Sequence, residues 1–486
     1  MQLRPNHERF LFSTLSLLLL CYAVLRAKLI PITIDEVSTV VNHATRSVYD
    51  IITYRADATP NNHVLHTLLV NFFTWLFGHH HVVVRIPAIL GGILYLWAAN
   101  RMAALGQTFW IRLFTWIVLL GNPYLIEFFS LARGYSLGAG AMLTAIYFSV
   151  RYLDSRAVKD IGSALFWGIL AVESNFTLLN FFAPFVVLLL LASKDSKKTQ
   201  WVLHWSVILG GVAVLAALCY TPIAAMRATN QFVFWGNEGF YKETLLELVR
   251  TGTRNADFFG PDTRFVLAWA IILIVVAGWI IALVRWWKRG FRLDMSIMVT
   301  GAFAGTFIVN MLQHYLLATP FLNARTALFY CPLFALQLMA MVQWIWEKWR
   351  NYALIFAIPA AWLLCFNFYR CYNLSNAYEW WFDAGTFKAI HFLEALQKSE
   401  NHTDPYALDT NWPNFNSFMY HIQMSTPHYE PVIALGKWHP AREFPRDTEF
   451  YYTDSDDEVQ KLNDAYEVVM VIPDTGLRLL RKRKKQ

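Results

Sequence analysis

Charged residues are scarce in this chain of 486 residues, where Asp, Glu, Lys and Arg together make up 15%. An ordinary soluble domain carries roughly 25%. Apolar residues reach 56% and aromatic residues 16%, and they gather in long blocks. This composition excludes a soluble multidomain enzyme and a disordered chain, and it predicts a polytopic membrane protein.

Cysteine is scarce as well, and the five cysteines form no Cys-x-x-Cys pair and no Cys/His cluster. The sequence therefore predicts neither a disulfide framework nor a structural zinc site. Internal repeats are also lacking. The net charge of +7 is typical of basic cytoplasmic loops in a membrane protein, so we expect no nucleic-acid partner.

Membrane topology follows from the basic loops. Lys and Arg favour the cytoplasmic side, and the loops at 151–160, 194–198 and 285–292 are basic. They share the side of the N-terminus only if the short apolar stretch 64–77 does not cross. We therefore predict that 64–77 is an amphipathic helix on the outer surface.

The basic loops on either side of 161–192 lie on the same side of the membrane only if the chain breaks near Glu173-Ser174-Asn175, so that 161–192 crosses the membrane twice. A spanning helix needs about 20 mostly apolar residues, and the prediction is eleven such helices, with the N-terminus inside and the C-terminus outside. The predicted spans lie near residues 10–30, 86–104, 107–127, 135–153, 161–173, 174–192, 201–221, 265–284, 295–316, 327–346 and 352–371.

The polar tail predicts a second, soluble domain. Its patterns indicate helices and strands in alternation, at 385–398, 405–410, 414–424, 449–453 and 466–472, with a further helix between the last two. The predicted fold class is an all-α polytopic membrane domain at 1–372, with outer loops 31–85 and 222–264. An extracytoplasmic α/β domain follows at 373–486.

Two adjacent carboxylates, Asp35 and Glu36, come directly after the first predicted helix. Charged groups this close to hydrocarbon are costly and are often functional. Either carboxylate can act as a general base on an acceptor hydroxyl, or bind a metal. The alternative is structural, because acidic residues also favour the N-terminus of a helix, here 35–55.

His63 and His66 follow on the same outer segment, three residues apart and therefore on one face of a helix. They are candidates for binding a sugar or phosphate, or a metal together with Asp35. The alternative is a surface helix capped by Asn61 or Asn62.

Three arginines, Arg85, Arg133 and Arg325, lie on the outer side that the positive-inside rule disfavours. Guanidinium groups suit phosphate oxygens, so the three are candidates for binding a lipid-linked phosphate. Tyr135 and Tyr315 accompany them as substrate-binding candidates. The alternative is that each arginine only reaches toward lipid headgroups.

Two further features complete the outer face. Glu127 and Glu173 fall near outer helix ends, where either can pair with one of these arginines. The loop 222–264 is aromatic and polar, with Phe232, Phe234 and Trp235, and such loops often form a lid over a site.

The order of these features resembles the GT-C superfamily of integral-membrane glycosyltransferases. The resemblance rests on Asp35-Glu36 after the first helix, a Pro-x-x-His segment at 60–63, Arg85-Ile86-Pro87, and Ala132-Arg133-Gly134-Tyr135. It is strongest over 31–140. The group most similar comprises bacterial relatives of protein O-mannosyltransferases and of the lipid A aminoarabinose transferase.

The resemblance implies a sugar donor linked to polyprenyl phosphate and transfer on the outer face of a bacterial plasma membrane. It implies Asp35 as base or metal ligand, Glu36 as its neighbour, and Arg85 and Arg133 beside the donor phosphate. Val64 replaces the proline that follows the histidine in the mannosyltransferases, and Ser136, Leu137 and Gly138 stand where many relatives carry an acid. A divalent metal ion remains an open alternative.

The expected chemistry is an inverting displacement. Asp35, assisted by Glu36, takes the acceptor proton, and arginines stabilise the departing lipid phosphate. The acceptor is a protein, a lipid or a glycan hydroxyl, and the remaining partners are membrane lipids. Competing hypotheses are an oligosaccharyltransferase or ligase, a flippase or transporter for lipid-linked sugars, and a non-catalytic scaffold.

Overall fold

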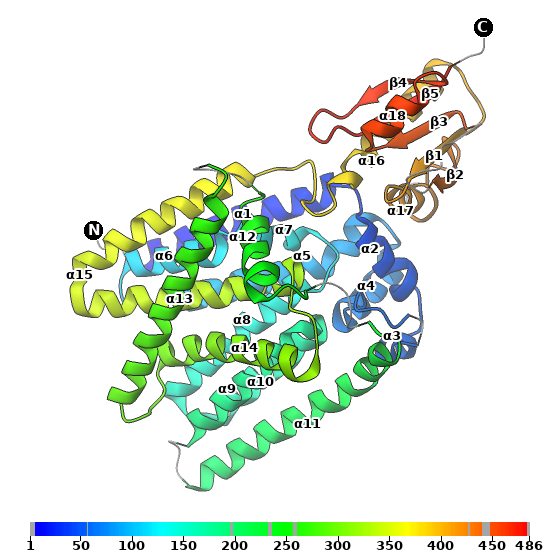
Figure 1. Cartoon of the computed structure of the whole chain (residues 1–486). Coiled ribbons are helices and arrows are strands. Elements are labelled where there is room, and N and C mark those ends of the chain that lie inside the picture. The colour runs from blue at the N-terminus through cyan, green and yellow to red at the C-terminus, as the bar shows by residue number, and fades with distance from the viewer. Residues whose placement is uncertain are drawn as a thin grey trace. The chain divides into compact units, whose positions relative to one another are not determined.

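The structure is a computed structural model of the whole chain. It describes residues 5–55, 57–194, 198–231, 236–255, 260–425, 428–439 and 448–483. Figure 1 labels its helices and strands in chain order. Phe232, Phe234 and Trp235 of the predicted lid lie outside the described residues.

The chain divides into two compact units. The first, called the membrane unit here, comprises residues 1–23, 46–68 and 87–372. The second, called the C-terminal unit, comprises 24–45, 69–86 and 373–486. The C-terminal unit thus takes in the tail from residue 373 together with the segment that carries Asp35 and the segment that carries Arg85.

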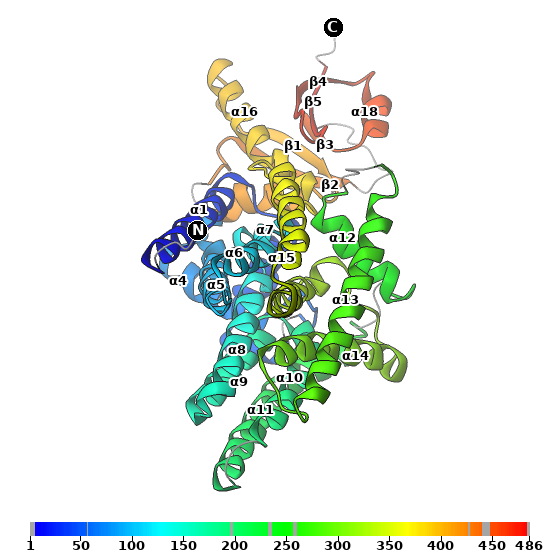
Figure 2. The same ribbon diagram turned by 90° about the vertical axis from the view of Figure 1, so that its left-hand side faces the viewer.

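The membrane unit is helical, and three of its helices (α1, α4 and α5) continue into the C-terminal unit. Figure 2 shows α8 to α11 side by side in one part of it. The helices are α1 Pro5–Leu29, α3 Val48–Thr53, α4 Val64–Phe77, α5 His81–Ala103, α6 Phe109–Leu120, α7 Pro123–Glu127, α8 Tyr135–Ser155, α9 Val158–Ser174, α10 Leu179–Ser193, α11 Lys198–Ala228, α12 Glu247–Gly252, α13 Thr263–Lys288, α14 Met295–Leu317 and α15 Tyr330–Cys371. Shorter 3-10 and π turns are η2 Phe128–Ser130, η3 Phe176–Leu178, η4 Tyr241–Leu246 and η5 Ala324–Ala327.

Eight helices of the described residues are long and apolar enough to cross a membrane, or nine if the bent pair 109–120 and 123–130 is one span. The sequence predicted eleven. The difference lies in α8 and α9, which do not meet the same measure of length and apolarity. α15 contains two of the spans, because its backbone leaves the helical region at Trp349 (φ −144°, ψ 63°). The chain is nonetheless a multi-pass membrane protein.

Two details of the predicted topology match helix boundaries. The stretch 64–77 forms a separate helix, α4, of 14 residues, which is too short to count as a span. α9 ends at Ser174, and Asn175 takes an extended conformation (φ −162°, ψ 108°) before the chain turns into η3 and α10. The break predicted near residues 173–175 is therefore confirmed.

Helices α5 and α8 approach each other closely through glycine. A Cβ atom added to Gly91 would lie 2.4 Å from the backbone nitrogen of Leu137, and one added to Gly140 would lie 2.7 Å from the carbonyl oxygen of Gly91. Small residues permit such contacts between membrane helices. This packing holds α8, which starts at Tyr135, against α5.

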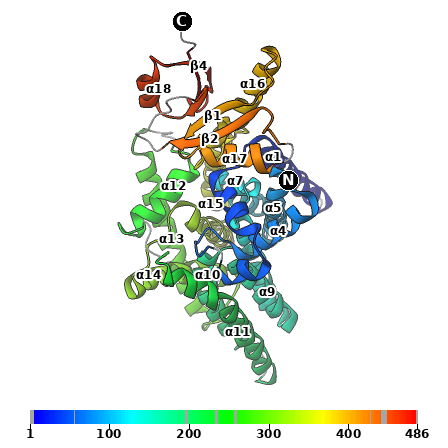
Figure 3. The ribbon, with the colours of Figure 1, turned by 90° about the vertical axis from the view of Figure 1, so that its right-hand side faces the viewer.

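The C-terminal unit contains a mixed sheet of five strands among the residues described, in the order β2-β1-β3-β5-β4. The first three strands run parallel, and β5 is antiparallel to both β3 and β4. Figure 3 shows α17 beside β1 and β2. The elements are α2 Ile34–Ser38, η1 Thr39–Ala44, η6 Trp381–Gly385, α16 Thr386–Ser399, β1 Tyr406–Asn411, α17 Phe415–Met419, η7 Tyr420–Met424, β2 Ile433–His439, β3 Phe450–Thr453, α18 Asp456–Leu462, β4 Tyr466–Val471 and β5 Arg478–Lys482.

The alternation of helices and strands predicted for the tail is confirmed, and one face of the sheet packs a core that includes Leu408, Phe450 and Leu479. Two strands, β2 and β5, were not predicted, because Gly436, Lys437 and the basic run from Arg478 interrupt their apolar pattern. The predicted helix 35–55 is instead three pieces, α2, η1 and α3.

The close approach of α5 and α8 predicts that Gly91→Ala destabilises the protein. Overpacking costs about 1–3 kcal/mol, so the thermal midpoint of the purified protein should fall by several degrees. Gly162→Ala in α9 is the matched control, because a Cβ there meets nothing within 4 Å. Equal midpoints for the two variants would contradict this account of the packing.

Candidate active site

The backbone between α1 and α2 is bound by the guanidinium group of Arg85. Nη1 donates to the carbonyl oxygens of Ala27 (2.9 Å) and Ile30 (2.6 Å), and Nη2 donates to that of Pro31 (2.8 Å). Nε and Nη2 also donate to the two carboxylate oxygens of Glu36, at 2.8 and 2.7 Å. All five N–H groups of Arg85 are therefore used within the C-terminal unit.

Glu36 completes this arrangement from α2. Its carboxylate accepts both hydrogen bonds from Arg85 and a third from the backbone N–H of Thr33 (2.8 Å). Both side chains of the pair are fully buried. A buried ion pair tolerates the loss of hydration only when its remaining hydrogen bonds are made, and here they are made by the backbone just before Asp35.

Three side chains from the tail bind the same backbone. The N–H of Ile32 donates to His421 Nε2 (3.2 Å), and the carbonyl oxygen of Ile32 accepts from Ser417 Oγ (2.7 Å). The N–H of Ile34 donates to Asp383 Oδ2 (3.0 Å). Residues 30–33 are irregular, buried backbone, where each polar group needs a partner, and the tail supplies partners for Ile32 and, at the start of α2, for Ile34.

The protonation states of the two buried tail groups follow from their burial. Burial raises the pKa of Asp383 well above its ordinary value of 3.8, although the N–H of Ile34 opposes the shift. Burial lowers the pKa of His421 well below 6.5, and nearby positive charge from Arg85 lowers it further. Burial thus favours the uncharged form of both groups, and a neutral His421 can accept at Nε2 as the geometry requires.

Asp35 is the carboxylate that this arrangement presents. It stands in the first turn of α2 and is partly exposed, whereas its neighbour Glu36 is buried. An acidic side chain is stabilised at this end of a helix. The surrounding hydrogen bonds fix the backbone on which Asp35 sits, and such fixed support is what a catalytic group needs.

In the membrane unit, His63, Arg133 and Tyr135 come together. The rings of His63 and Tyr135 lie 5.0 Å apart, edge to face, and the Arg133 guanidinium lies 5.8 Å from the Tyr135 ring. Arg133 Nη1 also donates to the carbonyl oxygen of Asn61 (3.4 Å). The close approach of this segment to His63 and Ser174 depends on Gly134, where a Cβ would lie 1.9 Å from the Ser174 carbonyl oxygen.

This cluster is buried yet polar. His63, His66 and Arg133 are at most 5% exposed. Two further buried atoms, Asn62 Oδ1 and Thr67 Oγ1, have no hydrogen-bond partner among the residues that the structure describes. Buried polar atoms rarely stay unsatisfied, so these two atoms are available to a bound polar ligand or to water.

The other predicted residues lie elsewhere in the membrane unit. Arg325 is half-buried on η5, next to α12. Tyr315 lies near the end of α14 with 73% of its surface exposed, and its neighbour His314 stacks on Phe321 at 3.9 Å. No contact recorded for the described residues joins Tyr315 to the His63 cluster.

The two outer glutamates have partners that the sequence did not suggest. Glu127 forms an ion pair with Arg254 from the 222–264 loop. Glu173 accepts a hydrogen bond from Cys219 Sγ at 3.7 Å.

The sequence analysis also missed Arg26, which is fully buried at the end of α1 and donates to the carbonyl oxygens of Asn373 (2.7 Å) and Asn376 (3.0 Å). Its only sequence signal is a charge inside an apolar run.

The donor set does not fit a resident metal ion. No group of three or more potential His, Cys, Asp or Glu ligands occurs within the described ranges. Glu36 is one of the two carboxylates that the sequence offers as a metal ligand, but both of its oxygens are bound by Arg85. We therefore assign no step of a reaction to a metal.

The buried pair predicts that Glu36→Gln destabilises the fold. Removing one partner leaves the Arg85 charge buried without compensation, which costs about 3–5 kcal/mol. The thermal midpoint should fall much further than for Glu238→Gln, a control at an exposed acid. A midpoint equal to that of the control would show that the pair does not hold the segment.

The raised pKa of Asp383 predicts how Asp383→Asn responds to pH. Because the pKa of Asp383 is raised in the folded protein, the free energy of unfolding of the wild type falls as pH rises from about 4 toward that folded-state pKa. The fall is at most about 1.4 kcal/mol per pH unit. Asn cannot ionise, so the variant should gain thermal midpoint relative to wild type between pH 5 and pH 8. Asp383→Ala is the comparison, because it loses the acceptor for the Ile34 N–H and should be destabilised at both pH values.

The fold is similar to that of proteins whose structures have been solved. No protein-family model and no curated protein matches the sequence. Among solved structures, ArnT from Cupriavidus metallidurans in the apo state is 12% identical with a TM-score of 0.51, and the match covers 98% of each chain. The same protein bound to undecaprenyl phosphate is 11% identical with a TM-score of 0.49 and the same coverage.

AglB from Archaeoglobus fulgidus, in complex with an inhibitory peptide and a dolichol-phosphate, is 12% identical with a TM-score of 0.42. That match covers 84% of this chain and 63% of AglB. The likeness to apo ArnT extends over nearly the whole length of both proteins. This chain therefore has an ArnT-like fold over nearly its whole length, and the resemblance drawn from the sequence is confirmed as far as the fold is concerned.

Proposed function

We propose that this protein is a membrane glycosyltransferase that moves a sugar from a polyprenyl-phosphate donor to an acceptor hydroxyl on the outer face of the membrane. The observation that carries the proposal is the fixed backbone before Asp35. Nine hydrogen bonds hold residues 27–36, and they involve the side chains of Arg85, Glu36, Asp383, Ser417 and His421. An ArnT-like fold supports the same class of reaction.

Asp35 is the proposed base. Its carboxylate is partly exposed at the start of α2, where it can take the proton of the acceptor hydroxyl. Glu36, expected from the sequence to assist it, instead acts as a positioning residue, because Arg85 binds both of its oxygens. Arg85 is likewise a positioning residue in this proposal, since its N–H groups are already used.

The proposed phosphate ligands are Arg133 and Arg325, with His63, His66 and Tyr135 as further substrate-binding residues. Arg133 is buried and stacks on Tyr135, and a guanidinium group in such a place interacts strongly with an anion. The unsatisfied atoms of Asn62 and Thr67 add hydrogen-bonding capacity beside it. Tyr315 is the weakest of the candidates, because its side chain is exposed.

The proposed reaction is a single displacement. The acceptor oxygen forms a bond with the anomeric carbon as its proton passes to Asp35, and the bond between that carbon and the phosphate oxygen breaks. The electron pair leaves with the lipid phosphate, whose charge Arg133 and Arg325 stabilise. One displacement inverts the anomeric centre. Oligosaccharide transfer and single-sugar transfer both follow this scheme.

The proposed setting is the plasma membrane of a bacterium, with the N-terminus in the cytoplasm and the C-terminal unit outside. The structure favours one element of that topology. The basic loops at 151–160 and 285–292, both predicted to be cytoplasmic, lie beside each other at the ends of α8 and α13. The partners are the lipid-linked donor, a protein, lipid or glycan acceptor, and membrane lipids.

Asp35→Asn tests the proposal directly. Purified wild type and variant would receive radiolabelled polyprenyl-phosphate sugars with extracted envelope acceptors. Loss of general-base catalysis should lower turnover by about 10²–10⁴-fold, with an unchanged thermal midpoint and unchanged donor binding. Asp262→Asn is the matched control, because Asp262 is an exposed acid in the 222–264 loop.

The competing functions give different results in the same assay. A flippase would move the labelled donor across a vesicle membrane without forming a product, and it would do so in the Asp35→Asn variant too. A scaffold would neither transfer nor hydrolyse the donor. Full turnover by Asp35→Asn would overturn the assignment of the base.

A further inference from the structure

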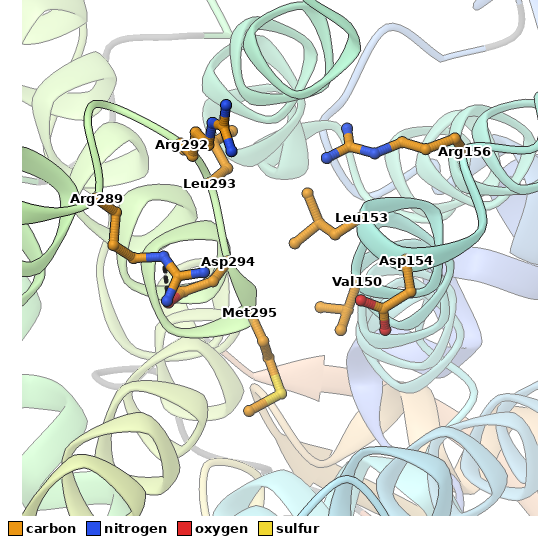
Figure 4. Close-up of a pocket in the computed structure, with 9 residues that line it drawn as sticks. All are labelled: Val150, Leu153, Asp154, Arg156, Arg289, Arg292, Leu293, Asp294 and Met295. Carbon is orange, nitrogen blue, oxygen red and sulfur yellow. Dashed lines mark ion pairs between the residues drawn. The ribbon is translucent and has the colours of Figure 1, made fainter. Parts of the chain in front are cut away.

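The membrane unit contains a cavity of about 450 Å³ at the ends of α8, α13 and α14. Figure 4 shows its lining. One wall comes from the end of α8 and the residue after it, and the other from the segment between α13 and α14. The residues that line it are Val150, Leu153, Asp154, Arg156, Arg289, Arg292, Leu293, Asp294 and Met295. The functional assignments above use none of them.

Two charged groups on opposite walls are unpaired. Arg292 is exposed, and it forms no hydrogen bond or ion pair with any residue that the structure describes. Asp154 is likewise exposed and without a partner in the described part of the chain. The cavity therefore holds a free cation and a free carboxylate that lie too far apart to pair with each other.

The other acid of the cavity is already neutralised. Asp294 pairs with Arg285 at 2.6 Å and with Arg289 at 3.6 Å, and its second oxygen accepts from the N–H of Ile297 at 3.0 Å. Arg156 points into the opening from the end of α8 (Figure 4), and its Nη1 also donates to the carbonyl oxygen of Ala192. The cavity thus offers the positive charge of Arg292 and Arg156 to an anion and one carboxylate to a hydrogen-bond donor.

The remaining lining is apolar. Val150, Leu153 and Met295 extend the cavity with hydrocarbon surface, as Figure 4 shows. A simple inorganic anion makes no favourable contact with such a surface. A phosphate ester with an attached carbon skeleton makes one, because burying its methylene groups is favourable.

The cavity lies at the end of α13, and this position indicates that it is at the depth of the lipid headgroups. α13 is strongly apolar and mostly exposed, as expected for a helix that faces lipid. Trp287 and Phe291, at its end and beside the cavity, are 68% and 62% exposed. Tryptophan is enriched where a membrane meets water, so Arg289 and Arg292 follow at the level of the headgroups.

We propose that this cavity binds the headgroup of a glycerophospholipid whose phosphodiester carries a hydroxyl or ammonium donor. Arg292 and Arg156 bind the phosphate oxygens, and Asp154 accepts the hydrogen bond from the hydroxyl or ammonium group. The apolar lining contacts the glycerol backbone. On the predicted topology the site takes lipid from the cytoplasmic leaflet, and it is separate from the residues assigned to glycosyl transfer.

The test is lipid binding to the delipidated full-length protein in detergent, followed by native mass spectrometry. The probes are phosphatidylglycerol, phosphatidylethanolamine and phosphatidylcholine, which has no donor in its headgroup, together with soluble glycerophosphoglycerol. Phosphatidylglycerol and phosphatidylethanolamine should bind about tenfold more tightly than phosphatidylcholine, because one charge-assisted hydrogen bond is gained.

Variants assign the effect to the cavity. Arg292→Gln should weaken phosphatidylglycerol binding by about tenfold, and Asp154→Asn should abolish the preference over phosphatidylcholine. Lys288→Gln is the matched control, since it removes an exposed charge from the adjacent end of α13 without lining the cavity. Both cavity residues are exposed, so neither variant should lower the thermal midpoint.

Three outcomes would overturn the proposal. Equal binding by Arg292→Gln and Lys288→Gln would show that the cavity is not the site. Equal binding of phosphatidylcholine by the wild type would remove the role of Asp154. Binding of glycerophosphoglycerol as tightly as of phosphatidylglycerol would identify a free phosphate ester, not a lipid, as the ligand.

Discussion

The buried ion pair between Glu36 and Arg85 is the interaction on which the candidate active site depends. It has no contact with water, so it persists only because the surrounding backbone completes its hydrogen bonds. Those backbone groups belong to the chain that leaves α1 and enters α2. One electrostatic requirement therefore fixes an irregular loop, and the loop carries Asp35.

The tail contributes to this site through three polar side chains. Asp383, Ser417 and His421 bind the backbone of Ile32 and Ile34, and burial shifts the pKa of Asp383 upward and that of His421 downward, toward the uncharged forms. A charged group in their place would compete with the Glu36–Arg85 pair at short range. The short helical elements η6, α17 and η7 of the tail thus support the loop.

Polar groups of the membrane unit fall into two sets with different requirements. His63, His66 and Arg133 are buried, so a ligand that reaches them meets charge in a medium of low dielectric constant. Arg292 and Asp154 lie at an exposed cavity, where water screens their charges. The first set suits transition-state stabilisation, and the second suits reversible lipid binding.

The sequence by itself determined the general architecture. Long apolar blocks require a membrane, and the change to mixed periodicity after residue 372 requires a second domain. The break at residues 173–175 was predicted from the positive charges of short loops, because each such loop lies next in sequence to the helix whose orientation it indicates. Of the eleven predicted spans, α8 and α9 fall short of the length and apolarity that the spans found among the described residues reach.

Within the site, the sequence identified Asp35, Glu36 and Arg85 as unusual, because charged residues beside apolar blocks are costly wherever they lie. Only the tertiary structure decided that Glu36 and Arg85 bind each other and that Asp35 stays partly exposed. The partners Asp383 and His421 lie more than 340 residues away along the chain, and ordinary sequence patterns carry no information on such contacts. Hydrogen bonds that form only in the folded protein decide that Glu36 and Arg85 hold the backbone, while Asp35 keeps a partly exposed side chain.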